Sequence, residues 1–140
     1  MDPSQELPPH NTPAYGDATL TLDTSSGLVT NVDGSFSSLL GGVTQVSLSD
    51  AGYGTNGPTI FTFSLDGSAG QTSGTFGGGG TLTSGQITDM LNSNIYINVR
   101  DSVYPSGEIR GQLIFVPEPS TVVMVCLGLA GILALRRCRH

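Results

Sequence analysis

The chain has 140 residues, a length that suits one small domain with a tail, and its formal net charge is −6. Lysine is absent, and residues 1–120 carry two Arg against eleven Asp and Glu, a net charge of −9. Such a surface repels phosphate backbones and argues against nucleic acid as a partner. The only cysteines, Cys126 and Cys138, lie in the tail. The rest of the chain therefore has neither a disulfide framework nor a thiolate zinc site.

The first third of the chain has the pattern of short strands joined by turns. Prolines at positions 3, 8, 9 and 13 exclude a helix from residues 1–16 and predict an extended lead. Residues 17–23 alternate apolar and polar side chains, which predicts a half-buried strand. Hairpin and turn signals predict further strands at residues 28–32, continued past a bulge at 35–37, and at 43–48.

The following part repeats this pattern and adds one helix. Strands are predicted at four places, residues 59–65, 75–76, 95–99 and 109–115. The glycine run at residues 77–80 is expected to be irregular. Residues 84–91 are predicted to be helical, because Thr83 and Gln86 fit a capping box. We therefore expect an all-β domain over residues 17–116, an antiparallel, Greek-key-like sandwich or barrel of about seven short strands with one short helix.

The tail, residues 117–140, has the composition of a membrane anchor. Residues 121–135 carry no charge and are followed by a basic end at 136–140. As a helix the apolar run is ~22 Å long, which is short for a bilayer core of ~30 Å. Long basic side chains can extend the span by reaching back to the interface. A buried core helix is disfavoured, because the run has no polar face.

We predict a C-terminal transmembrane helix with its basic end in the cytoplasm. The anchor residues are Val122, Val123, Val125, Leu127, Leu129, Ile132, Leu133 and Leu135, and the basic stop is Arg136, Arg137 and Arg139.

Pro117, Glu118 and Pro119 directly precede the apolar run. The order of tripeptide, short apolar helix and Arg cluster resembles the PEP-CTERM sorting signal of Gram-negative bacteria. The resemblance implies that the protein is exported, held in the inner membrane by its tail and processed near the tripeptide by an exosortase-type enzyme. The mature protein is then expected at the cell surface or in an extracellular matrix of exopolysaccharide. Exopolysaccharide and surface proteins are therefore candidate partners.

A second resemblance is carried by the last strand of the domain. The run Gly107, Glu108, Ile109, Arg110, Gly111 and Gln112 resembles the end of a CHRD (chordin-type) domain, which occurs in bacterial exported proteins. Residues 5–9 match its opening, so the resemblance begins at about residue 5. Because Glu108 and Arg110 share the face opposite Ile109, we expect a Glu–Arg pair or a cross-strand partner to fix the register there. A ligand contact is the alternative role of this signature.

The chain departs from the CHRD pattern where that family often has histidine. Ser47 and Ser49 stand at a frequent His-x-His, and Arg100 stands at a frequent His. The two histidines present are His10 in the lead and His140 at the end, so an imidazole metal cluster cannot be built. We therefore expect neither a metal nor a cofactor.

An oxygen-ligand cation site from Asp50, Asp101 and carbonyls is the alternative to a metal-free domain. No His lies within residues 17–116 to activate Ser or Thr, and no motif singles out a pair of carboxylates. We therefore expect no catalytic residue and predict a non-enzymatic, exported surface or matrix protein with a binding or structural domain. The alternatives are a tail-anchored inner-membrane protein that is never processed, and an enzyme with an unrecognised carboxylate site.

The N-terminal residues do not have the pattern of an export signal, although the tail has the pattern of a sorting signal. Export through the inner membrane requires a basic start and an apolar stretch, and residues 1–16 contain neither. The CHRD resemblance also implies a strand ahead of residue 5. We therefore expect this sequence to start too late and to lack its signal peptide. The alternatives are a misplaced start codon, a gene fragment, or a tail that inserts after synthesis and carries a cytoplasmic domain.

Overall fold

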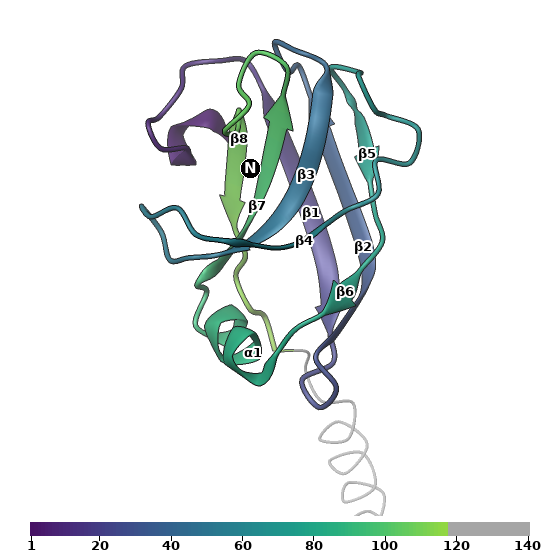
Figure 1. Cartoon of the computed structure of the whole chain (residues 1–140), viewed down its shortest axis with the longest axis vertical. Coiled ribbons are helices and arrows are strands. Elements are labelled where there is room, and N and C mark those ends of the chain that lie inside the picture. The colour runs from purple at the N-terminus through teal and green to yellow at the C-terminus, as the bar shows by residue number, and fades with distance from the viewer. Residues whose placement is uncertain (118–140) are drawn as a thin grey trace, which may run out of the picture.

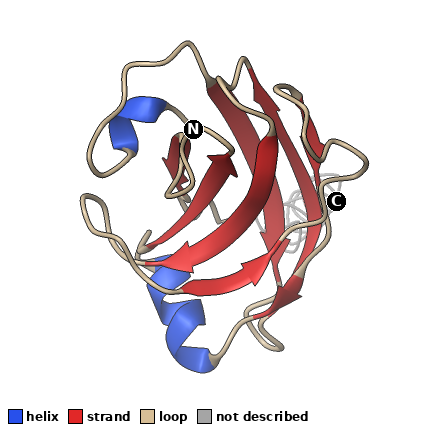
Figure 2. Cartoon of the chain, turned by 45° about the horizontal axis from the view of Figure 1, so that its top comes forward, coloured by secondary structure: helices blue, strands red, loops and turns tan. Residues whose placement is uncertain are grey.

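The computed structural model describes residues 1–117. Two antiparallel sheets face each other, and a short α-helix lies at one end of the domain (Figure 1, Figure 2). The elements are η1 (Pro3–Gln5), β1 (Tyr15–Leu22), β2 (Leu28–Ser37), β3 (Val43–Asp50), β4 (Thr59–Thr62), β5 (Gly74–Phe76), β6 (Gly80–Thr81), α1 (Ser84–Leu91), β7 (Ile95–Asp101) and β8 (Ile109–Gln112).

The two sheets have different strand orders. In the first sheet β2 lies between β1 and β5 and also pairs with the short β6. In the second sheet the order is β4-β3-β7-β8, so β3 and β7 are its inner strands. Within residues 1–117, the predicted all-β class with one short α-helix is confirmed. This part of the chain has eight strands where about seven were expected, because Gly80 of the glycine run pairs with Val29 and begins β6.

Apolar side chains from both sheets fill the space between them. The buried core includes Val29, Phe36, Val46, Leu48, Phe63, Phe76, Ile97, Val99 and Ile109. The rings of Phe63, which follows β4, and Phe76 of β5 lie 5.3 Å apart and join the two sheets. Full burial of such a side chain contributes about 1.5–3 kcal/mol, so this layer is the main source of stability.

The helix α1 has the bounds that its capping residues predict. Thr83 Oγ1 accepts a hydrogen bond from the Gln86 backbone N–H, and Gln86 Oε1 accepts one from the Thr83 N–H at 2.9 Å. Both exchanges satisfy donors that the first turn of a helix leaves free. Met90 is buried and Ile87 half-buried against the core, whereas Leu91 is 41% exposed.

Two segments differ from the prediction for local reasons. The lead is not wholly extended, because residues 3–5 form the single 3-10 turn η1. Asp2 caps this turn, and the ring of Pro3 has the backbone angle that a helix start requires. The strand predicted to reach residue 65 ends at Thr62. Beyond it Ser64 pairs with Gly77, so the chain leaves the second sheet for the first.

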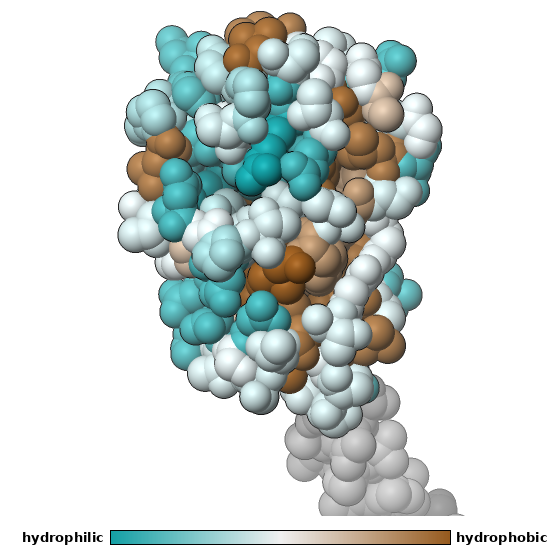
Figure 3. Space-filling model, in the orientation of Figure 1, coloured by the Kyte–Doolittle hydropathy of each residue, from teal (hydrophilic) through white to brown (hydrophobic). Residues whose placement is uncertain are grey.

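The last strand is also shorter than predicted. It ends at Gln112 rather than at residue 115. The N–H of Leu113 still donates to the Ile95 carbonyl at 2.9 Å, but the side chains of Ile114 and Val116 are 77% and 75% exposed. On the face of the domain drawn in Figure 3, polar residues dominate and apolar side chains show as small separate areas.

Candidate functional site

The signature run, residues 107–112, leads into β8 at the edge of the second sheet. Ile109 is fully buried between the sheets, so Glu108 and Arg110 face the outer side. The register places Arg110 opposite Asn98 of β7. This outer side is buried as well, since Arg110 is 1% and Asn98 4% exposed. We call the side chains of Asn98, Glu108 and Arg110, together with the groups that they contact, the outer network.

The lead and the loop after β3 cover the outer network. Asp2 and Arg110 exchange two backbone hydrogen bonds, and Gln5 Oε1 accepts a third from the Gln112 N–H at 3.2 Å. Gln112 Nε2 in turn donates to the Ala51 carbonyl at 2.9 Å. Figure 1 shows η1 beside β8, at the edge of the sheet. The polar side chains of β8 therefore lie under protein rather than in solvent.

Arg110 is the centre of the outer network. Its guanidinium carbon lies 3.5 Å from the centre of the Tyr96 ring. Its nitrogens donate to four oxygens, those of the Thr55 and Gly52 carbonyls at 2.7 and 3.1 Å and of the Asn56 and Gln112 side chains at 3.2 and 3.3 Å. Burial lowers the pKa of Arg110, while the charges of Tyr96 and Glu6 raise it. Arg110 thus contacts the neighbouring strand β7 through the Tyr96 ring, whereas its side-chain hydrogen bonds go to the loop after β3 and to Gln112 of its own strand.

Glu108 has a separate structural task with Asp101. Both of its carboxylate oxygens accept from the Leu40 backbone N–H, at 3.2 and 3.0 Å. Asp101 accepts from the N–H groups of Gly41 and Tyr104. Burial raises the pKa of Glu108, and the neighbouring Asp101 raises it as well, while the Leu40 N–H lowers it. The two carboxylates thus hold the connection between β2 and β3 against the second sheet.

Several buried polar atoms of this region have no hydrogen-bond partner. They are Glu6 Oε1, Ser47 Oγ, Ser49 Oγ, Asn98 Oδ1 and Arg100 Nε. Burial raises the pKa of Glu6 to about 7, although Arg110 acts in the opposite direction. Gly107, with φ +140°, lies so close that a Cβ there would overlap both Glu6 Oε1 and Asn98 Oδ1. A protonated Glu6 suits this position, because it brings a donor beside an acceptor that lacks one.

The positions at which the CHRD pattern often has histidine do share the outer face. Ser47 of β3 pairs with Asn98, and Gln45 pairs with Arg100 of β7. On that face Ser47 and Ser49 present hydroxyls and Arg100 presents a guanidinium. Residues 1–117 contain no group of three His, Cys, Asp or Glu placed to hold a metal ion.

The alternative cation site is not formed. Asp50 pairs with Ile95 and Asp101 pairs with Val43, at opposite ends of the ladder between β3 and β7. Their carboxylates therefore cannot share one cation, whose oxygen ligands lie within about 2.6 Å of it.

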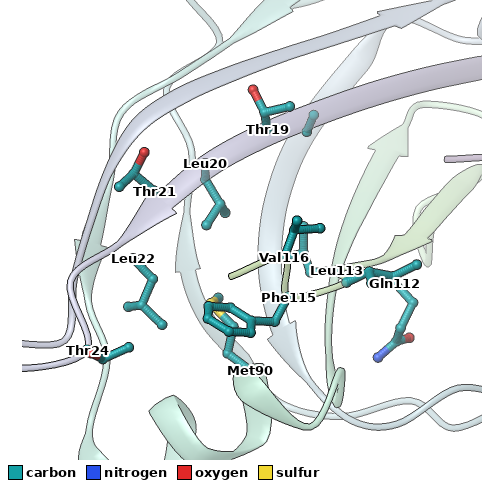
Figure 4. Close-up of a pocket in the computed structure, with 12 residues that line it drawn as sticks. Thr19, Leu20, Thr21, Leu22, Thr24, Met90, Gln112, Leu113, Phe115 and Val116 are labelled. Atoms are coloured by element: carbon teal, nitrogen blue, oxygen red, sulfur yellow. The ribbon is translucent and has the colours of Figure 1, made fainter. Parts of the chain in front are cut away.

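A second candidate site is a groove of about 710 Å³ between β1 and the segment after β8. Figure 4 shows Leu20, Leu22 and Phe115 directed into it, while Thr19 and Thr21 point away. Met90 of α1 also lines it. All of its lining residues are uncharged. The sequence did not predict this groove, because the alternation at residues 109–115 predicted a paired strand where the groove has one of its walls.

The sorting residues lie almost entirely outside the described part of the chain. Pro117 is the last described residue, and Glu118, Pro119, the predicted anchor and the basic stop follow it. Within residues 1–117, no helix is long and apolar enough to span a membrane.

Comparisons with known proteins agree with both resemblances. A family model of the CHRD domain matches residues 1–113, and one of the PEP-CTERM protein-sorting motif matches residues 115–138. No curated protein and no solved structure matches the chain. The first match covers most of the sequence and the second begins two residues after it. The chain therefore belongs to the CHRD domain family and carries a C-terminal PEP-CTERM sorting motif.

Proposed function

We propose that this protein is a non-enzymatic component of the cell surface or extracellular matrix, delivered there by exosortase-type sorting. A CHRD domain joined to a PEP-CTERM motif fits an exported protein of this sorting route, and this combination is the observation that carries the proposal. The tail holds the protein in the inner membrane first. Processing near residues 117–119 then frees the domain for the surface, where exopolysaccharide or other surface proteins are its partners.

The physical basis of the anchor is the apolar run and its basic end. A helix over residues 121–135 is ~22 Å long, and Arg136, Arg137 and Arg139 extend it by placing their charges at the cytoplasmic interface. The domain then sits on the opposite side of the membrane. This orientation is the one that export of the domain requires.

The use of the signature residues supports a structural rather than a catalytic domain. The guanidinium of Arg110 and the carboxylate of Glu108 are occupied by hydrogen bonds that hold loops on the sheets. The one imidazole in residues 1–117 belongs to His10, whose ring packs on Tyr104 with centres 4.2 Å apart. Neither the hydrogen bonds of Arg110 and Glu108 nor the stack of His10 on Tyr104 pairs a nucleophile with a base.

Membrane fractionation tests the anchor. In a host without an exosortase, where the tail is not removed, the double change Leu129→Asp and Ile132→Asp places charges that cost about 2.5–3.5 kcal/mol each near mid-bilayer. The variant should leave the membrane fraction. The matched control is Val103→Asp, which puts one charge on an exposed side chain of the domain. If the double variant stays in the membrane with the control, the tail is not the anchor.

Processing is read separately, from the mass of the protein recovered outside the cell. Loss of the tail near Pro117 is expected in a host with the exosortase, and the intact mass in the same host without it. An intact, membrane-bound protein in both hosts would instead establish a permanent anchor. Glu118→Ala should block processing while leaving the protein in the membrane, since it changes the motif and not the apolar run.

A further inference from the structure

The loop between β3 and β4 holds an asparagine directly before a glycine. Asn56 is the only asparagine of the sequence that a glycine follows. Its side chain is exposed, whereas Gly57 is half-buried. A Cβ at residue 57 would lie 1.8 Å from the Asp50 carbonyl oxygen, so the packing of the loop requires glycine there. Because glycine has no side chain, nothing on residue 57 shields its backbone nitrogen from the side chain of Asn56.

Two hydrogen bonds from the outer network hold the side chain of Asn56 and the backbone of Gly57. Arg110 Nη1 donates to Asn56 Oδ1 at 3.2 Å, and the Gly57 N–H donates to the Tyr96 hydroxyl oxygen at 3.2 Å. Arg110 and Tyr96 are buried and stack on each other. A guanidinium at an amide oxygen stabilises the negative charge that attack on the amide carbon places on that oxygen. The Asn56 amide is thereby activated toward a nucleophile that is its neighbour in the chain.

The buried charge of Arg110 is hydrogen-bonded to neutral groups only. Its four acceptors are two backbone carbonyls and two side-chain amides. Burying a charge is costly unless an opposite charge is paired with it. Glu6 acts on Arg110 through space, but burial raises the pKa of Glu6 to about 7. A carboxylate at residue 56 would give the guanidinium a charged acceptor, which makes a stronger hydrogen bond than an amide does.

We propose that Asn56 is a self-modification site, at which the folded domain converts asparagine to aspartate. The Gly57 nitrogen gives its proton to water and forms a bond to Asn56 Cγ. The bond between Cγ and Nδ2 breaks, and the nitrogen leaves as ammonia, so that a succinimide ring remains. Water then adds to Cγ, the bond from Cγ to the Gly57 nitrogen breaks, and a carboxylate is left. The conversion consumes one water and releases one ammonium ion.

The fold favours aspartate over isoaspartate as the product. Opening of the ring at its other carbonyl would give isoaspartate, which inserts an extra carbon into the backbone. The Asp50 carbonyl leaves no room for an added carbon at Gly57. The new carboxylate pairs with Arg110 and holds the loop more firmly over β8. The site does not depend on how the protein is sorted.

The rate and the product of the reaction test the site. The full chain in detergent micelles and a blocked peptide of residues 50–60 are kept at neutral pH. Mass spectrometry of digests follows the change from amide to acid, and a protease that cuts before aspartate but not before isoaspartate identifies the product. The folded chain should react about tenfold faster than the peptide, the effect of a barrier lowered by ~1.4 kcal/mol. It should yield chiefly aspartate, whereas the peptide yields chiefly isoaspartate. Asn92, which precedes Ser93, is the reference for conversion during handling.

Variants test the part of Arg110 and the value of the product. Arg110→Lys should slow the conversion to the rate of the peptide while near-ultraviolet circular dichroism shows a folded domain. If this variant does not fold, the comparison with the peptide still decides. Asn56→Asp supplies the product directly and should raise the midpoint of urea unfolding by about 0.5 M. Asn11→Asp makes the same change at an exposed residue of the lead and should leave the midpoint unchanged.

Three results would overturn the proposal. Absence of conversion in the folded chain shows that the loop protects the amide. Equal rates in chain and peptide, with isoaspartate as the main product of both, assign the reaction to the dipeptide alone. An Asn56→Asp midpoint no higher than that of Asn11→Asp removes the pairing with Arg110.

Discussion

Replacing Arg110 with methionine tests whether the outer network holds the domain together. Methionine keeps the length of the side chain but loses four hydrogen bonds and the stack on Tyr96. Hydrogen bonds to a charged group contribute about 1.5–3 kcal/mol each, and a stacked cation about 0.5–2 kcal/mol. Methionine also avoids the cost of burying a charged guanidinium, and this gain offsets much of the sum. We therefore expect a net loss of about 3–5 kcal/mol, as when one partner of a buried charged contact is removed.

Two further variants separate geometry from charge. Arg110→Lys keeps the charge but loses the planar, forked donor set, so we expect roughly half of the methionine effect. Arg100→Met is the matched control. Arg100 is half-buried and makes one hydrogen bond, to Gln45 Oε1 at 2.9 Å. Its loss should cost about 1 kcal/mol.

Urea unfolding of the full chain in detergent micelles, followed by circular dichroism, measures these differences. With a slope of about 1–3 kcal/mol per molar urea, the Arg110→Met midpoint should fall by roughly 1–5 M, and the slope itself should stay unchanged. A midpoint for Arg110→Met equal to that of the Arg100→Met control would refute the reasoning. The signature arginine would then be free for a ligand contact, the alternative role considered for it.

The remaining predictions concern Glu6, a glycine and metal. Because burial raises the Glu6 pKa to about 7, the folded state holds this proton more tightly, so stability should fall as pH rises from about 4.5 to 7, by at most about 3 kcal/mol. Glu6→Gln should remove the Glu6 contribution and so reduce this slope in melts across that range, and an unchanged slope would contradict the assignment. Gly107→Ala should destabilise by about 2–3 kcal/mol through overlap with Glu6 and Asn98. Gly85→Ala, with open space in α1, should stabilise by about 0.5–1 kcal/mol. Melts with and without chelator should coincide, and a lower midpoint on chelation would reveal a metal site.

Local sequence signals identified the elements whose causes are local. The Thr83–Gln86 capping box predicted α1 to the residue, because helix starts depend on groups three residues apart. Alternation predicted most strands. The one-turn η1 was missed because several prolines were read as forbidding helix, although Pro3 at a first position favours one.

Contacts between distant residues decided what local patterns could not. Alternation predicted the strand β7, and such alternation is ordinarily typical of a half-buried strand. Tyr96 and Asn98 on its outer face are nevertheless 2% and 4% exposed, because the lead and the loop after β3 fold over them. The partners of Arg110 in that loop lie 54 to 58 residues away in the chain. No spacing rule connects such residues, so the sequence predicted a shared face and not its partners.

By itself, the sequence determined the class of the domain and its sorting tail. Both depend on periodicity, composition and short contiguous motifs, such as the run 107–112 and the tripeptide at 117–119. The tertiary structure alone decided that the signature holds loops in place and that a groove separates β1 from the end of β8. Pairing between edges depends on how two sheets meet in space, and neither edge carries that information in its own sequence.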